Sequence, residues 1–115
     1  MRAYDVAFAG ALCFRFPVLM PVLQEHLADY DSLLPHVLMG DVTRWVVQRF
    51  LTNAGDSTLR QMLDMFEMAF EKANSEEREL LAASFLENLP RVGDEGAGIR
   101  TILGPTLQEQ LLQIP

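Results

Sequence analysis

Apolar residues recur along most of this chain at intervals of three and four, which is the spacing of amphipathic helices. The clearest pattern spans residues 57–73, where one helical face carries only apolar side chains: Leu59, Met62, Leu63, Phe66, Ala69, Phe70 and Ala73. The opposite face carries three acids and one methionine: Asp64, Glu67, Glu71 and Met68. A helix over about 57–73, with Asp56 or Ser57 as its N-cap, is therefore predicted.

The stretch from Leu33 to Leu51 contains the only tryptophan and a group of Pro, Gly and Asp between apolar residues. Pro35 suits the first turn of a helix, and the apolar residues that follow keep a helical spacing. Gly40 is expected either to break this helix after a short first turn or to let another helix approach closely. Asp41 would then be an N-cap or a first-turn acid.

The same spacing predicts further helices over about 17–30, 75–89 and 105–113. His26 in the first of these is expected to be a surface or half-buried polar residue. Asn74 and Glu77 fit a capping box at the start of the second, whose later part is apolar on most sides, as in a central bundle helix. Residues 93–98 are expected to form a mobile Gly-rich loop, and they lack the spacing of a phosphate-binding loop.

Residues 1–16 form an apolar N-terminal segment that is predicted to be a separate short helix packed on the domain. Arg2 and the apolar run over 6–14 resemble a secretory signal, but Asp5 breaks that pattern. The run is also shorter than the ~20 residues of a membrane span. The alternatives are a cleaved or mobile leader, and a natural start further along the chain.

The chain contains no useful length of alternating apolar and polar residues, so no sheet is expected. Its 115 residues match the usual size of one domain, and half of them are apolar, which argues against disorder. These observations predict an all-α, single-domain protein over residues 1–115. The architecture would be an irregular bundle of five to six helices.

Sixteen acidic and nine basic residues give a net charge of −7, which argues against nucleic acid or an anionic membrane as the partner. A basic protein is the better electrostatic match. Residues 64–95 hold nine acids and three bases, a net −6. The candidate partner-binding residues lie there: Asp64, Glu67, Met68, Glu71, Glu76, Glu77 and Glu79. The alternative is a solvated acidic surface that aids solubility.

Four side chains of the central stretch form a candidate ligand pocket: His36, Asp41, Arg44 and Trp45. In this interpretation His36 and Asp41 act as a proton-transfer couple. In the alternative, His36 is a residue of the N-terminal turn, Asp41 is a cap and Trp45 is a core anchor. Neither a nucleophile nor a metal-ligand cluster follows at a useful spacing, so no catalytic residue, metal or other cofactor is predicted, and enzyme activity is not expected.

The single cysteine, Cys13, excludes an intrachain disulfide, as expected of a protein from the reducing cytoplasm. Its apolar neighbours Leu12 and Phe14 indicate a buried structural thiol rather than a nucleophile.

Three motifs carry a family resemblance: Leu34-Pro35-His36, Met39-Gly40-Asp41 followed by Trp45, and Phe85-Leu86-Glu87-Asn88-Leu89. Through them the chain resembles a family of short, uncharacterised bacterial all-helical proteins over about residues 14–113. The resemblance implies no catalytic residues. By size, acidity and helical build, the chain is also similar to immunity proteins that neutralise bacterial toxins, an analogy of class.

The sequence therefore predicts a small acidic protein-binding module of immunity type, whose carboxylates steer and block a basic partner. One alternative is a self-associating helical protein of unknown role, in which residues 6–16 form the homodimer contact. Another is a small ligand-binding bundle that uses His36 and Trp45.

Overall fold

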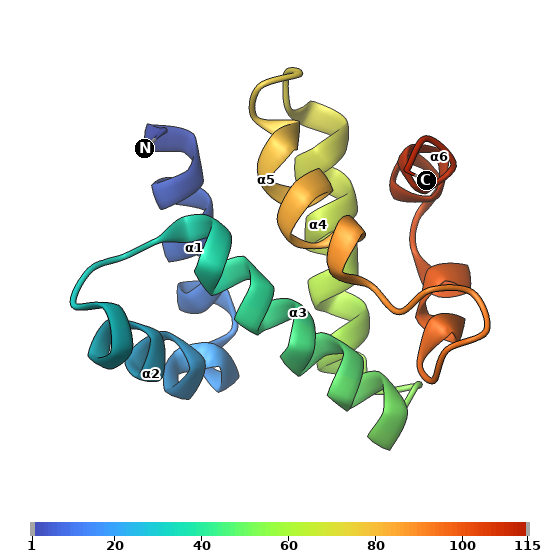
Figure 1. Ribbon diagram of the computed structural model, residues 1–115, viewed down its shortest axis with the longest axis horizontal. Coiled ribbons are helices and arrows are strands. Elements are labelled where there is room, and N and C mark those ends of the chain that lie inside the picture. The colour runs from blue at the N-terminus through green and yellow to red at the C-terminus, as the bar shows by residue number, and fades with distance from the viewer. Residues whose placement is uncertain (1, 115) are drawn as a thin grey trace.

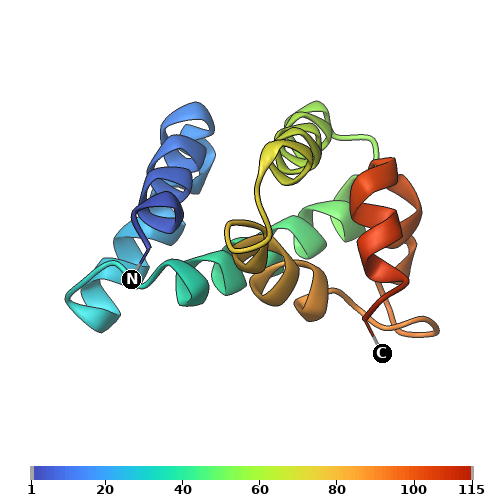
Figure 2. The same cartoon turned by 90° about the horizontal axis from the view of Figure 1, so that it is seen from above.

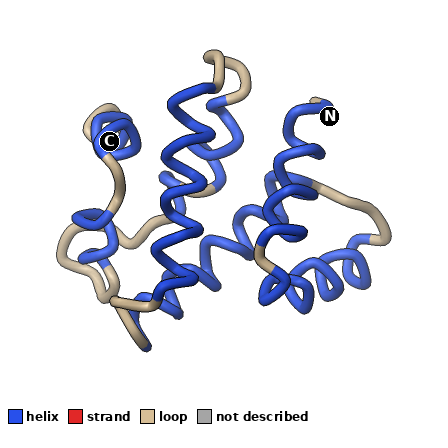
Figure 3. Tube along the Cα trace, turned by 180° about the vertical axis from the view of Figure 1, so that it is seen from behind, coloured by secondary structure: helices blue, strands red, loops and turns tan. Residues whose placement is uncertain are grey.

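The structure, a computed structural model, describes residues 2–114. Its α-helices are α1 (Ala3–Arg15), α2 (Met20–Tyr30), α3 (Pro35–Thr52), α4 (Ser57–Lys72), α5 (Arg78–Ser84) and α6 (Pro105–Leu111). Its 3₁₀-helices are η1 (Pro17–Leu19), η2 (Leu86–Asn88) and η3 (Ala97–Ile102). The described range contains no strand (Figure 3), so the predicted all-α fold without a sheet is confirmed.

Helix α3 is the longest element, and it contacts α1, α2, α4 and α5. Figure 1 shows α1 and α2 at one side of the molecule, α6 at the opposite side, and α4 and α5 between them. Seen from above, α3 extends from the α1–α2 pair toward the C-terminal part of the chain (Figure 2). Helix α3 therefore links the two ends of the bundle.

The apolar face predicted for α4 forms the middle of the core. Its buried residues are Leu59, Met62, Leu63, Phe66 and Phe70. The ring of Phe66 lies between those of Phe8 and Phe85, at centroid distances of 6.0 and 4.9 Å, so α1, α4 and the end of α5 share one core. The Asp56 cap is also confirmed, because its carboxylate accepts the Leu59 N–H at 3.0 Å. This hydrogen bond lowers the pKa of Asp56.

Gly40 does not interrupt α3, contrary to the prediction from sequence. The helix runs without a break from Pro35 to Thr52, and Gly40 is buried within it. A single glycine costs a helix only about 1 kcal/mol, which the burial of α3 outweighs. A Cβ at Gly40 would lie 3.8 Å from Nδ2 of Asn88, so this residue faces η2 at ordinary contact distance. Asp41 consequently lies inside the helix and is not its cap.

In the structure, the helix predicted over 75–89 begins later and is divided into α5 and the 3₁₀-helix η2. The capping box is confirmed: the Asn74 N–H donates to Glu77 at 3.0 Å, and the Glu77 N–H donates to Asn74 at 2.9 Å. The residues inside this box form a turn, and regular helix begins only at Arg78. After Ser84 the chain tightens into the 3₁₀ turn of η2.

The N-terminal segment forms α1 and packs on the domain as predicted. Its buried side chains include Phe8, Leu12 and Cys13, and burial raises the pKa of the Cys13 thiol. Phe14, in contrast, is 88% exposed. Among the described residues, no single helix has the length and apolar composition of a membrane span; α1 and the following η1–α2 segment, bent by 108°, meet these criteria only as a pair.

Candidate functional site

Three of the predicted partner-binding residues form an exposed row along α4, referred to below as the α4 row. Asp64, Met68 and Glu71 follow one another at steps of four and three, which places them on one helix face. Met68 is 54% exposed. Within residues 2–114, neither carboxylate of the row takes part in an ion pair.

Glu67 does not face outward with this row, and the sequence-based placement is wrong for this residue. Its two carboxylate oxygens accept the N–H groups of Thr106 and Leu107, at 2.8 and 2.9 Å. Glu67 thereby caps the N-terminus of α6, where backbone donors have no helical acceptor. A Cβ on Gly104 would collide with the Glu67 carboxylate, so a larger residue there would push this side chain away from the cap. The sequence indicated this role only indirectly: no Ser, Thr, Asp or Asn directly precedes Pro105, so α6 lacks a local cap and needs an acceptor from elsewhere.

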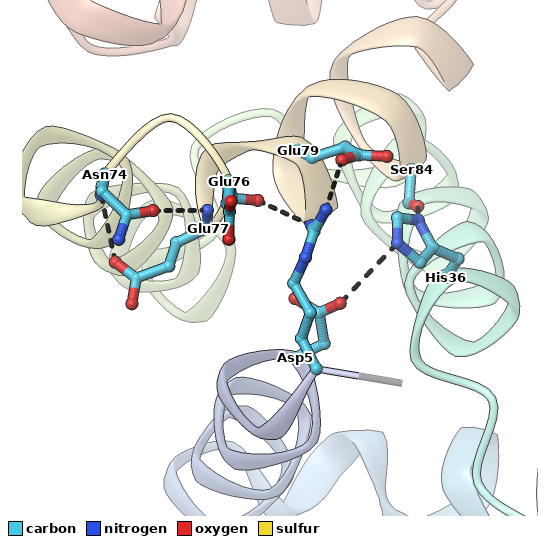
Figure 4. Close-up of polar contacts among 8 residues, drawn as sticks. Asp5, His36, Asn74, Glu76, Glu77, Glu79 and Ser84 are labelled. Carbon is cyan, nitrogen blue, oxygen red and sulfur yellow. Dashed lines mark hydrogen bonds and ion pairs between the residues drawn. The ribbon is translucent and has the colours of Figure 1, made fainter.

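The three acids that precede or begin α5 also contact other parts of the chain (Figure 4). Glu77 belongs to the capping box, and Glu79 forms an ion pair of 2.8 Å with Arg2. Arg2 also donates to the backbone carbonyl of Glu76 at 2.7 Å. The hydrogen bond and the charge of Arg2 lower the pKa of Glu79. The residue that precedes α1 is thus held to the start of α5.

A partly buried polar cluster of Asp5, His36 and Ser84 joins α1, α3 and α5, and sequence reasoning missed it (Figure 4). Nδ1 of His36 lies 2.6 Å from Oγ of Ser84, and Nε2 lies 3.8 Å from a carboxylate oxygen of Asp5. Asp5 and Ser84 are each only 4% exposed, whereas 45% of the His36 side chain is exposed. No local pattern indicates this cluster, because its members come from three separate helices.

The cluster contains the residue types of a Ser-His-Asp triad but not its working geometry. A distance of 3.8 Å is too long for the hydrogen bond that would orient the imidazole. The Ser84 hydroxyl is also enclosed, and a nucleophile must be open to the substrate carbonyl. In this arrangement the three side chains tie three helices together.

Asp41 lies between a side chain of its own helix and one of α2. Arg44 pairs with one carboxylate oxygen, and the other oxygen faces Nδ1 of His26 at 3.8 Å. His26 is 1% exposed, so the expectation of a surface or half-buried residue is wrong. Its Nε2 accepts the Leu34 N–H at 3.0 Å, which assigns the ring proton to Nδ1.

The four residues of the predicted pocket do not converge. His36 contacts the α1 and α5 residues of the polar cluster, and Asp41 and Arg44 line a pocket against α2. Trp45 lines a different pocket, with the Arg49 guanidinium 5.5 Å from its ring centroid. Because nine residues at 100° each equal two and a half turns, positions 36 and 45 lie on opposite sides of α3.

The pocket between α2 and α3 has a volume of about 410 Å³. Its lining consists of Val22, Glu25, Asp29, Tyr30, Asp41 and Arg44. Sequence reasoning missed this α2–α3 pocket, although residues 16–43 contain four acids and no Lys or Arg. Among residues 2–114, no group of three or more His, Cys, Asp or Glu side chains is arranged to hold a metal ion.

These observations define a small all-α domain whose polar sites lie at the contacts between helices. A family model described as a domain of unknown function (DUF7674) matches residues 10–114, and the chain belongs to this family. The match confirms the expected membership of an uncharacterised family, over nearly the expected range. No curated protein and no solved structure matches the chain. Asp5 precedes the matched residues, whereas His36, Ser84 and the lining of the α2–α3 pocket lie within them.

Proposed function

We propose that this chain is a small acidic protein-binding module that associates with a basic partner protein in the cytoplasm, as an immunity-type protein does. The module covers a surface of its partner and makes or breaks no covalent bond. Its charge speeds the encounter, and an apolar contact slows the dissociation of the complex.

The observation that carries this proposal is the α4 row. Met68 is exposed between two carboxylates, those of Asp64 and Glu71, which no ion pair within the described residues neutralises. Methionine has a flexible, polarisable side chain that adapts to the surface it meets. An apolar contact with charges on both sides suits a partner surface that has an apolar centre and a basic rim.

The charge of the whole chain supports the same kind of partner. A net charge of −7 attracts a basic protein before contact. At physiological salt this attraction acts over about 8–10 Å, so it falls as salt is added.

The test is capture of proteins from a lysate of the source organism, at low and at high salt, with three forms of the purified chain. These are the wild type, an Asp64→Lys/Glu71→Lys variant, and an Asp94→Lys/Glu109→Lys control. The control makes the same charge change at two exposed acids outside the row. We expect wild type and control to retain one basic protein at low salt, and the α4 variant to lose it.

Equal retention of that protein by all three forms would remove the α4 row from the interface. If the wild type retains no basic protein at either salt, the proposed function itself is wrong.

Self-association is a second candidate function, and the outer side of α1 favours it. Phe14 and Val6 are exposed on this side, and the residues between and beside them are small and uncharged: Ala3, Ala7, Gly10 and Ala11. A face without charge is the part of an acidic chain that a second copy can approach most easily.

Removing α1 would not test this idea cleanly, because Phe8 and Leu12 belong to the core. A Val6→Ser/Phe14→Ser variant leaves the core intact. Sedimentation equilibrium should then show a dimeric wild type and a monomeric variant. A monomeric wild type, or a variant that stays dimeric, would exclude this face as a homodimer contact.

A further inference from the structure

We infer that the α2–α3 pocket is a binding site for a cationic side chain, an arginine in the first place, that the basic partner inserts. This inference rests on the proposed function, because it names the chemical group of the partner that the module recognises. It adds a specific contact on a surface of the molecule that shares no residue with the α4 row.

The charges of the lining favour a cation. Three carboxylates and one guanidinium line the pocket, a net −2, and the guanidinium of Arg44 is already paired with Asp41. Glu25 and Asp29 have no ion pair within the described residues. They are four positions apart on α2, so their like charges repel each other along one helix face. A bound cation removes this repulsion.

The aromatic wall of the pocket favours a planar cation over a spherical one. Tyr30 lines the pocket, and its ring is held against the buried ring of His26 at a centroid distance of 5.0 Å. A guanidinium can lie flat on an aromatic ring while its N–H groups reach carboxylates at the edge, whereas an ammonium makes no such stacked contact.

His26 does not line the pocket itself but lies next to two of its lining residues, Tyr30 and Asp41. Its ring is buried, and its Nδ1–H has no hydrogen-bond partner among the described residues. Its Nδ1 lies 3.8 Å from a carboxylate oxygen of Asp41, which belongs to the α3 wall of the pocket. A buried donor without an acceptor is costly. If a ligand replaces Arg44 as the counter-ion of Asp41, the carboxylate is free to move closer to His26.

Arg44 is therefore the internal competitor for the site. Its side chain is exposed, so it can turn into solvent when another cation reaches Asp41. Removing Arg44 should strengthen the binding of a cation and weaken the binding of an anion, which makes this residue a sensitive test of the ligand's charge.

The test uses the full-length chain and two small probes, N-acetyl-arginine amide and its neutral isostere N-acetyl-citrulline amide. Amide chemical shifts are followed in ¹H–¹⁵N NMR spectra during each titration. We expect the arginine probe to shift the signals of Asp29, Tyr30 and Arg44 in a saturable way, and the citrulline probe to leave them in place. Shifts of equal size at Asp64 and Glu71, or an equal response to citrulline, would overturn the inference.

Three variants sharpen the result. Glu25→Gln/Asp29→Asn should weaken the arginine probe about fivefold or more, as expected for the loss of exposed ion pairs. Arg44→Gln should bind it more tightly, and the control Asp64→Asn/Glu71→Gln should bind it as the wild type does. Weaker binding by Arg44→Gln would contradict a cation site.

The small probes separate this inference from the proposed function. Binding of the arginine probe in the pocket without capture of a basic protein would support the binding site and contradict the proposed function. Capture of a basic protein through the α4 row, with no response of the pocket to arginine, would support the proposed function and contradict the binding site.

Discussion

Two acidic regions of this chain use their carboxylates in different ways. Residues 64–95 contain nine acids, and three of them serve the fold: Glu67 caps α6, Glu77 closes a capping box, and Glu79 forms an ion pair. Residues 16–43 contain only four acids and no Lys or Arg, and three of those acids line one pocket. The region with fewer acids therefore brings most of them together around one pocket.

The difference shows why the number of acids in a segment is a poor guide to a binding surface. Helix N-termini present unpaired N–H groups, and a nearby carboxylate stabilises the protein by satisfying them. In a region rich in helix ends, such as that around α5 and α6, nearby acids accept hydrogen bonds from these N–H groups. Helix α2 offers no such partner to Glu25 and Asp29, so these two acids remain available.

The largest effect is expected for Gly104→Ala. The added methyl group collides with the Glu67 carboxylate, so both hydrogen bonds of the α6 cap must shift. We expect a loss of about 1–3 kcal/mol in the free energy of unfolding, measured by urea denaturation. The same substitution should cost much less in a Glu67→Ala background, because the collision is gone. An equal cost in both backgrounds would show that Glu67 is not its cause.

A smaller loss is expected when the cap alone is removed. Glu67→Ala leaves the Thr106 and Leu107 N–H groups without their acceptor and should lower the free energy of unfolding by about 1–2 kcal/mol. Glu71→Ala, one turn further along α4, should stay within about 0.5 kcal/mol of wild type. Equal losses for the two variants would contradict the distinction between structural and free acids.

The pocket should respond with the opposite sign. Glu25→Gln/Asp29→Asn removes two like charges four residues apart. We expect the free energy of unfolding to stay level or to rise by at most about 0.5 kcal/mol. Calorimetry at low salt is the measurement, because salt screens the repulsion. A clear loss of stability would mean that these acids serve the fold, as Glu67 does.

The smallest effect is expected at Glu79, and it depends on pH. Arg2 lowers the pKa of Glu79 in the folded protein, so this pair stabilises the fold above the unfolded-state pKa. The stabilisation is lost as the pH falls through the lower, folded-state pKa. Wild type should therefore melt slightly above Glu79→Gln at neutral pH, and the two should coincide in acid. A difference that is the same at both pH values would rule out the carboxylate charge as its source.

The local elements of the fold could be predicted from the sequence. The helical period placed α4 and its Asp56 cap, the Asn74–Glu77 pair placed the capping box, and the apolar neighbours of Cys13 indicated its burial. These features depend on residues within one or two turns of each other, and such short-range relations are visible in the order of the residues. The break expected at Gly40 was wrong because tertiary packing outweighs the helix propensity of one residue.

The candidate sites depend on tertiary structure. Glu67 meets a helix that begins almost forty residues later, and His36 meets Asp5 and Ser84 from two other helices. By itself the sequence determined the all-α class, most helix positions and the acidic character of the chain. Only the tertiary structure decided which carboxylates serve the fold and which line the α2–α3 pocket. The physical reason is that helical periodicity is a local property, whereas the partner of a charge is whatever the folded chain brings within a few ångströms of it.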